Sequence, residues 1–158
     1  MTCFSFDDPL GGAFAAPKVL SSRNWTHVQH EVSPHSGERK LKPGYRASAR
    51  GALLTLSTQA VGEQEFKLGY LSSRSSAARV ALRCVDGCVC SEVQVGASGQ
   101  KAAGDTTSTT EFTTRHVARA TQGKACHVAL EMLTDGQPFK LVALHVRSAL
   151  VGGGGAEA

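Results

Sequence analysis

The sequence has no apolar run long enough to cross a membrane, and it has few aromatic or charged residues. No stretch of its 158 residues approaches the roughly 20 apolar residues of a membrane helix, so we expect no membrane span. Aromatic residues make up 6% of the chain and charged residues 19%. Gly, Ser, Thr and Ala are abundant instead, as in β-rich domains with many loops. The length suits one domain that buries about two-thirds of its unfolded surface.

Positive charge is mild and scattered. The formal net charge is +4, and the only local concentration of basic residues is Arg39, Lys40, Lys42, Arg46 and Arg50. Such a stretch could contact phosphate or an acidic polysaccharide, although a solvated loop and strand edge is the simpler interpretation. No aromatic platform is interleaved with it, so we predict no nucleic-acid partner.

Motifs of the common hydrolases are missing. The sequence contains no G-x-S-x-G element, no obvious carboxylate pair among its 13 acidic residues, and no glycine-rich phosphate loop that leads into a helix. The six histidines fit ordinary strand or loop positions. They are His27, His30, His35, His116, His127 and His145. We therefore predict no enzymatic activity, no cofactor and no metal.

The first eight residues lack the basic and apolar regions of a signal peptide. We expect the start to be the interior or mature end of a longer precursor. Two features indicate that this precursor is secreted. Five cysteines in a small β domain suit an oxidising compartment, and Asn24-Trp25-Thr26 is an N-glycosylation triplet. The expected location is extracellular or at the cell surface, with Asn24 glycosylated.

Alternating apolar residues lead into the cysteines. Cys126, Val128, Leu130 and Met132 share one face of a predicted strand, because side chains alternate with a period of two. Val80, Leu82 and Cys84 share a face in the same way. Both Cys84 and Cys126 thus lie in apolar rows, which favours a bridge between them across the core.

The other cysteines leave alternatives open. Cys84, Cys88, Cys90 and Cys126 allow three ways of making two bridges. With Cys84 joined to Cys126, Cys88 and Cys90 would pair with each other, or one would pair elsewhere, and Cys3 is the odd cysteine. A metal site from Cys84, Cys88, Cys90 and His127 is the competing hypothesis. The C-x3-C-x-C spacing fits zinc knuckles poorly, so we prefer disulfides.

The chain predicts an irregular N-terminal arm at 1–24, a β-sandwich domain at 25–151 and a flexible tail at 152–158. The segment 33–44 reads as a loop. Strands at 65–71 and 78–85 predict one hairpin, and 124–133 with 138–146 predict another around Asp135-Gly136. Eight or so short strands with regular turns indicate an all-β, disulfide-stapled, two-sheet β-sandwich or jelly roll.

A set of short blocks, in constant order, extends over nearly the whole chain. They are C-F-S-F-D-D at 3–8, W-T-H at 25–27, K-P-G-Y-R-A at 42–47, L-G-Y-L-S-S at 68–73, C-V-D-G-C-V-C at 84–90, and Cys126 with F-K-L at 139–141. With these blocks the chain resembles the C-terminal module of secreted plant and algal proteins described as SGNH-hydrolase-like. The resemblance implies a β-sandwich that accompanies a hydrolase-like domain. It transfers no catalytic residue, because no SGNH motif is present here. The turn at 73–76 departs from the family's Gly-tipped, Tyr-containing turn, which implies a different specificity if that turn binds a ligand.

The resulting functional prediction is a non-catalytic module that binds carbohydrate or a cell-surface or extracellular partner. Candidate stacking platforms are Trp25, Tyr45 and Tyr70, with Arg46 and Arg74 as polar anchors. Trp25 and Tyr70 suit core or edge packing even better. The alternatives are a structural subunit of a larger extracellular or ciliary assembly, which binds other protein subunits, and part of an SGNH-type esterase.

Overall fold

The computed structural model describes most of the chain, and every regular element in the described part is a β-strand. It describes residues 2–6, 15–32, 36–37, 39–72, 77–96, 109–112, 116–120 and 123–148. Within these ranges no helix has the length and apolar character that crossing a bilayer would require.

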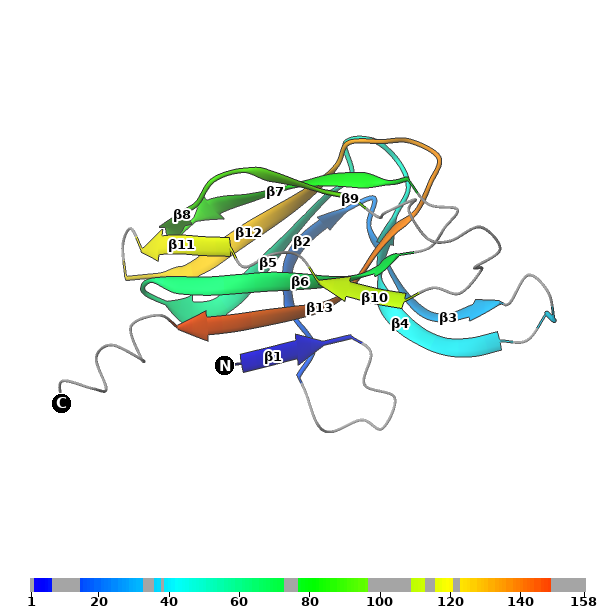
Figure 1. Cartoon of the computed structure of the whole chain (residues 1–158), viewed down its shortest axis with the longest axis horizontal. Coiled ribbons are helices and arrows are strands. Elements are labelled where there is room, and N and C mark those ends of the chain that lie inside the picture. Colours follow the sequence, from blue (N-terminus) through cyan, green and yellow to red (C-terminus); the bar gives the residue numbers. More distant parts are fainter. Residues whose placement is uncertain are drawn as a thin grey trace.

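The described strands form two sheets that pack face to face (Figure 1). The eight-stranded sheet has the order β3 (Thr26–Val32), β4 (Arg39–Ala47), β13 (Phe139–Ser148), β6 (Gln64–Ser72), β11 (His116–Ala120) and β8 (Cys88–Val89), with β1 (Thr2–Ser5) beside β13 and β10 (Thr109–Phe112) beside β6. The five-stranded sheet has the order β2 (Lys18–Arg23), β5 (Leu53–Val61), β12 (Ala125–Met132), β7 (Arg79–Asp86) and β9 (Val93–Gly96). The predicted all-β, two-sheet sandwich is confirmed.

The alternating rows of the sequence form the core between the sheets. On β12, Cys126, Val128, Leu130 and Met132 are all 0–1% exposed. On the other sheet, Leu68 lies opposite Leu144, and both are fully buried. Burial of such rows on two facing sheets is the main stabilising contribution of a sandwich.

Neither predicted hairpin is present. The strand β6 pairs with β13, whereas β7 pairs with β12 and β9 in the other sheet. Likewise β12 and β13 belong to different sheets, so the chain crosses the sandwich at the Asp135-Gly136 turn. The same alternating pattern flanks a turn that closes a hairpin and a turn that leads to the other sheet. The local sequence therefore did not distinguish the two kinds of turn.

The segment predicted as an irregular arm contains two strands, and the predicted 33–44 loop is shorter than expected. Within 1–24, β1 pairs with β13 and β2 pairs with β5. Within 33–44, β4 begins at Arg39 and pairs with β3. These segments are extended because a neighbouring strand supplies hydrogen-bond partners, which local propensity does not reveal. The predicted tail at 152–158 lies outside the described residues.

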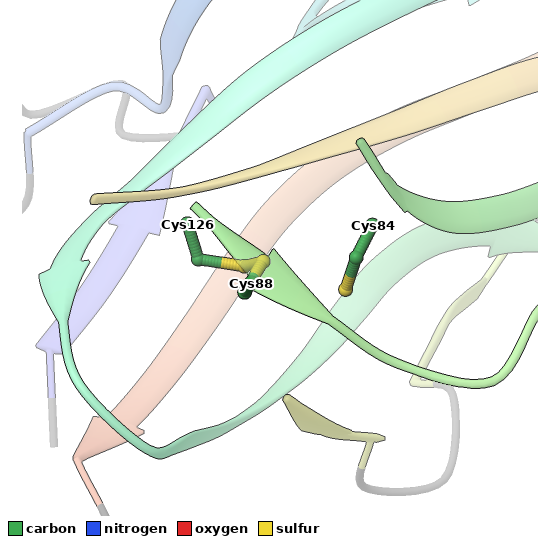
Figure 2. A group of neighbouring side chains, drawn as sticks. All are labelled: Cys84, Cys88 and Cys126. Atoms are coloured by element: carbon green, nitrogen blue, oxygen red, sulfur yellow. A yellow bond between two sulfur atoms is a disulfide. The ribbon is translucent and has the colours of Figure 1, made fainter. Parts of the chain in front are cut away.

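Two disulfides are present, but they are not the predicted pair. Cys84 is joined to Cys90. Cys88 is joined to Cys126, and Figure 2 shows this second bridge. The predicted bridge from Cys84 to Cys126 is therefore wrong. The regular register of β7 with β12 places Val128, and not Cys126, opposite Cys84, and the turn at Gly87 then brings Cys88 against Cys126. All five cysteines are described, and among them Cys3 carries no bridge.

Candidate functional site

Three aromatic side chains from three strands or strand ends meet beside the β3–β4 hairpin. The ring centroids of Phe6 and Tyr45 are 5.0 Å apart, those of His27 and Tyr45 are 5.4 Å apart, and those of Phe6 and His27 are 6.0 Å apart. We call Phe6, His27 and Tyr45 the aromatic cluster. Tilted and edge-on contacts of this kind hold the rings in a defined arrangement.

Strand register places the aromatic cluster on the core-facing side of the eight-stranded sheet. His27 lies opposite Tyr45, and Tyr45 lies opposite the fully buried Leu141. Residues directly opposite each other in an antiparallel pair project from the same face. Phe6 reaches this face from the end of β1, where its backbone N–H donates to the Val142 carbonyl at 2.8 Å.

The cluster is more accessible than the rest of that face. His27 is exposed, and Phe6 and Tyr45 are only partly buried. The strand β3 is the edge of its sheet, and Figure 1 shows the β3–β4 hairpin at the opposite end of the molecule from β8 and β11. Edge position thus leaves aromatic surface available to a ligand on a face that is otherwise core.

Trp25 and Tyr70, two of the predicted stacking platforms, are core residues. Their exposed fractions are 5% and 7%. Phe139 lies between them, stacked on Tyr70 at 5.2 Å and edge-on to Trp25 at 6.2 Å. The Tyr70 hydroxyl donates to the Gly96 carbonyl at 3.2 Å, which ties β6 to the other sheet. Their rings therefore contribute packing and are not available as surface platforms.

Arg46, one of the two predicted polar anchors, does not lie beside the Tyr45 ring. Arg46 is exposed, but it lies opposite Lys140 on the other face of the sheet, because adjacent residues of a strand point to opposite sides. Lys140 is 4% exposed, and its side chain lies against Gly44. Arg74 lies outside the described residues.

Two further arginines form local ion pairs. The backbone N–H of Arg50 donates to the Asp135 carboxylate at 2.6 Å, and their side chains lie 4.0 Å apart. Arg83 lies between Glu131 at 2.9 Å and Glu92 at 3.6 Å. Arg83 is thus held between two carboxylates, whereas the Arg50–Asp135 pair is open to solvent, with 70% of each side chain exposed.

The outward face of the sheet holds a second group of titratable residues. Cys3 lies opposite His145, and His145 lies opposite Lys67. Burial lowers the pKa of His145, and the positive charge of Lys67 lowers it further. Neutral imidazole is therefore favoured here, and this row is separate from the aromatic cluster on the opposite face.

Sequence reasoning missed Phe6 and His27. The register of a β3–β4 hairpin would have placed His27 beside Tyr45, but the predicted loop at 33–44 concealed that pairing. No local signal points to Phe6, because its position depends on β1 pairing with the last strand of the domain.

No protein-family profile matches the sequence, and no curated protein matches it. Solved structures do resemble it. A two-domain esterase active on acetylated mannans, co-crystallised with mannopentaose, aligns with a TM-score of 0.50 at 18% identity. The alignment covers 84% of this chain and 36% of the esterase. The two share a β-sandwich fold.

Two carbohydrate-binding modules are also similar. The C-terminal family 6 module of LamC, a marine laminarinase from Zobellia galactanivorans, has a TM-score of 0.46 and 12% identity, with 90% of this chain and 96% of the module covered. A module from Cellvibrio mixtus lichenase 5A, solved with cellotriose, has a TM-score of 0.46 and 12% identity, with 94% and 97% covered.

Proposed function

We propose that this chain is a non-catalytic β-sandwich module that binds carbohydrate through the aromatic cluster. The observation that carries the proposal is the accessible Phe6, His27 and Tyr45 group at the edge of the core-facing surface. A pyranose ring offers a face of C–H bonds and a rim of hydroxyls. Aromatic rings contact the C–H face, while the Tyr45 hydroxyl and the His27 imidazole can hydrogen-bond to the rim.

The structural neighbours support a role beside a hydrolase. The esterase that shares the fold acts on acetylated mannans and has two domains. This chain matches 36% of the esterase's length. Together with the sequence blocks that resemble SGNH-hydrolase-like proteins, this match favours a module that accompanies such an esterase and directs it to a polysaccharide. Mannan is accordingly the first ligand to test.

We also propose that the protein is secreted and carries an N-glycan on Asn24. Asn24 is exposed at the turn between β2 and β3, with a φ of 62°. Ser22 closes this turn by donating to the Trp25 carbonyl at 2.7 Å, and Thr26 of the triplet is exposed. The two disulfides suit the same compartment. A fall in mass after treatment with a peptide N-glycosidase is the expected result for protein from its own source.

The unbridged Cys3 favours a second candidate, a structural subunit of a larger extracellular assembly. Cys3 is partly accessible on β1, so a disulfide to another chain is chemically feasible. Native mass under non-reducing conditions separates the two candidates. A fixed, larger complex that dissociates on reduction supports the subunit, and a monomer supports the binding module.

Substitution of Tyr45 tests the binding site directly. Tyr45→Ala removes the central ring of the cluster, whereas Tyr45→Phe keeps the ring and removes only the hydroxyl. We expect Tyr45→Ala to weaken binding at least about tenfold, because an aromatic side chain that a ligand covers contributes ~1.4 kcal/mol or more to binding. Tyr45→Phe should weaken binding less. Affinity electrophoresis in mannan, laminarin, xylan and a polyuronate, with calorimetry on the best ligand, measures the effect.

The matched control is Val61→Ala, which shortens an exposed side chain on β5 outside the cluster. This variant should bind as the parent protein does. Failure of the parent protein to bind any of the polysaccharides would contradict the proposed function. Equal binding by folded Tyr45→Ala would leave carbohydrate binding in place and contradict the assigned site.

A further inference from the structure

Three cysteine sulfurs gather near the β7–β8 turn, and a fourth is bonded to one of them. The Sγ atoms of Cys84, Cys88 and Cys126 all lie within 4.8 Å of one another, and Cys90 is bonded to Cys84. Figure 2 shows the Cys84 sulfur beside the bridge between Cys88 and Cys126. The two disulfides are therefore neighbours, and each of the three clustered sulfurs has another sulfur close by besides its own bonded partner.

The backbone positions of these cysteines depend on strand pairing as well as on the bridges. Cys84 lies opposite Val128 in the β7–β12 ladder, and Cys88 lies opposite Ala120 in the β8–β11 ladder. The turn between them packs directly on β12, because a Cβ atom at Gly87 would overlap the Ala125 carbonyl. Strand ladders and this tight contact hold the side chains near one another when the sulfur–sulfur bonds are broken.

We propose that reduction converts the two bridges into a four-thiolate site for Zn²⁺ or a similar soft ion. Thiolates select such ions, and structural zinc sites are tetrahedral with Zn–S distances of about 2.3 Å, which places the sulfurs about 3.8 Å apart. Three of the four sulfurs already lie within 4.8 Å of one another. Rotation of the side chains about χ1 provides the remaining adjustment.

Cys126 completes the ligand set, in place of the His127 that local sequence suggested. The Nδ1 atom of His127 lies 3.7 Å from the Asp86 carboxylate. The Cys88 sulfur lies 3.5 Å from the Asp86 carbonyl and 4.0 Å from the His127 carbonyl, and these oxygens can accept the thiol proton of the reduced, metal-free protein. Zinc binding replaces that proton.

The chemistry balances with a low-molecular-weight thiol as the reductant. Four molecules of this thiol reduce the two bridges to four cysteine thiols and leave as two molecules of its own disulfide. Binding of one Zn²⁺ to the four thiols releases four protons. Cys84 and Cys90 are partly accessible, whereas Cys88 and Cys126 are 5% and 1% exposed, so attack begins at the Cys84–Cys90 bridge.

Cobalt titration of the full chain tests the proposal. The protein is purified oxidised, reduced with a phosphine without oxygen, and titrated with Co²⁺. We expect one equivalent to produce the intense visible absorption and sulfur-to-metal charge transfer of tetrahedral cobalt thiolate, and Zn²⁺ to abolish both. The oxidised protein should produce neither. Absence of these bands in the reduced parent protein would overturn the inference.

Two substitutions distinguish a metal site that requires the fold from metal binding by the neighbouring Cys84, Cys88 and Cys90 alone. Cys126→Ser removes the ligand that only the fold brings to the others. It should weaken cobalt binding by about 100-fold or more, because loss of a direct ligand costs more affinity than the roughly 10–100-fold that loss of a residue supporting a ligand costs. Cys3→Ser removes the cysteine outside the group and should leave binding unchanged. Equal binding by Cys126→Ser, or equal loss in Cys3→Ser, contradicts a site made of these four cysteines.

Discussion

Gly87 is held by two constraints at once. Its φ is +73°, in the left-handed region, and a Cβ atom there would overlap the Ala125 carbonyl oxygen. Gly51 has a similar φ of +84°, but nothing lies within 4 Å of the place that a Cβ atom would occupy. Gly51 therefore requires glycine only for its backbone conformation, whereas Gly87 requires it for its conformation and for lack of space. At Gly87 the close approach is what directs Cys88 toward Cys126.

We expect Gly87→Ala to destabilise the fold more than Gly51→Ala. The left-handed conformation costs an L-residue about 1–2 kcal/mol in both variants. Overlap with a backbone carbonyl adds about 1–3 kcal/mol in Gly87→Ala alone. Urea unfolding of both variants measures the difference in the free energy of unfolding. Equal losses would mean that β12 can move away from the turn at little cost.

At the scale of elements, β1 is held in place by β13, a strand at the other end of the described chain. It pairs with β13, and Phe4 lies opposite Leu144 in the core with 6% of its surface exposed. Ser5 donates its N–H to the Ala15 carbonyl at 2.9 Å, which ties β1 to the chain before β2. The same strand end delivers Phe6 to the aromatic cluster, so β1 contributes to both packing and the proposed site.

Phe4→Ala should lower the free energy of unfolding by about 3 kcal/mol, because it removes a buried aromatic side chain and leaves a cavity. Thr2→Ala is the matched control on the same strand, since Thr2 is exposed, and should change stability by less than about 0.5 kcal/mol. Thermal and urea unfolding measure both. A Phe4→Ala protein as stable as the control would show that β1 does not belong to the folded core.

At the scale of the whole molecule, the two disulfides differ in what they connect. The Cys88–Cys126 bridge joins β8 of the eight-stranded sheet to β12 of the five-stranded sheet, across 38 residues of sequence. The Cys84–Cys90 bridge spans 6 residues near the same turn. The longer bridge constrains the unfolded chain more, because closing a longer loop removes more conformational entropy.

Removal of the inter-sheet bridge should cost more stability than removal of the local one. Loop-closure entropy predicts a loss of about 4 kcal/mol for Cys88→Ala with Cys126→Ala, and about 2 kcal/mol for Cys84→Ala with Cys90→Ala. Unfolding of the two double variants without reductant tests the order, and peptide mapping of the parent protein tests the pairing. A reversed order, or a bridge from Cys84 to Cys126, would contradict this arrangement.

The local sequence pattern correctly predicted that strands are present and which face of β12 is buried in the core. The period of two along 126–132 correctly identified four buried residues, because a strand of a two-sheet sandwich buries the face that points toward the other sheet. The scarcity of long apolar runs and the turn signals likewise predicted an all-β sandwich. These properties depend on residues within about ten positions of one another, so the chain itself determines them.

Only the tertiary structure decided which strands are neighbours, which cysteines pair, and which aromatic residues share a surface. The β7–β12 register places Val128 opposite Cys84, and Cys126 is bonded to Cys88 instead. Tyr45, on the strand next to the sheet edge, is partly accessible, whereas Trp25 and Tyr70 are buried, although local sequence made all three candidates for a surface platform. Each of these outcomes depends on contacts between segments far apart in the chain, and such contacts leave no local pattern to read.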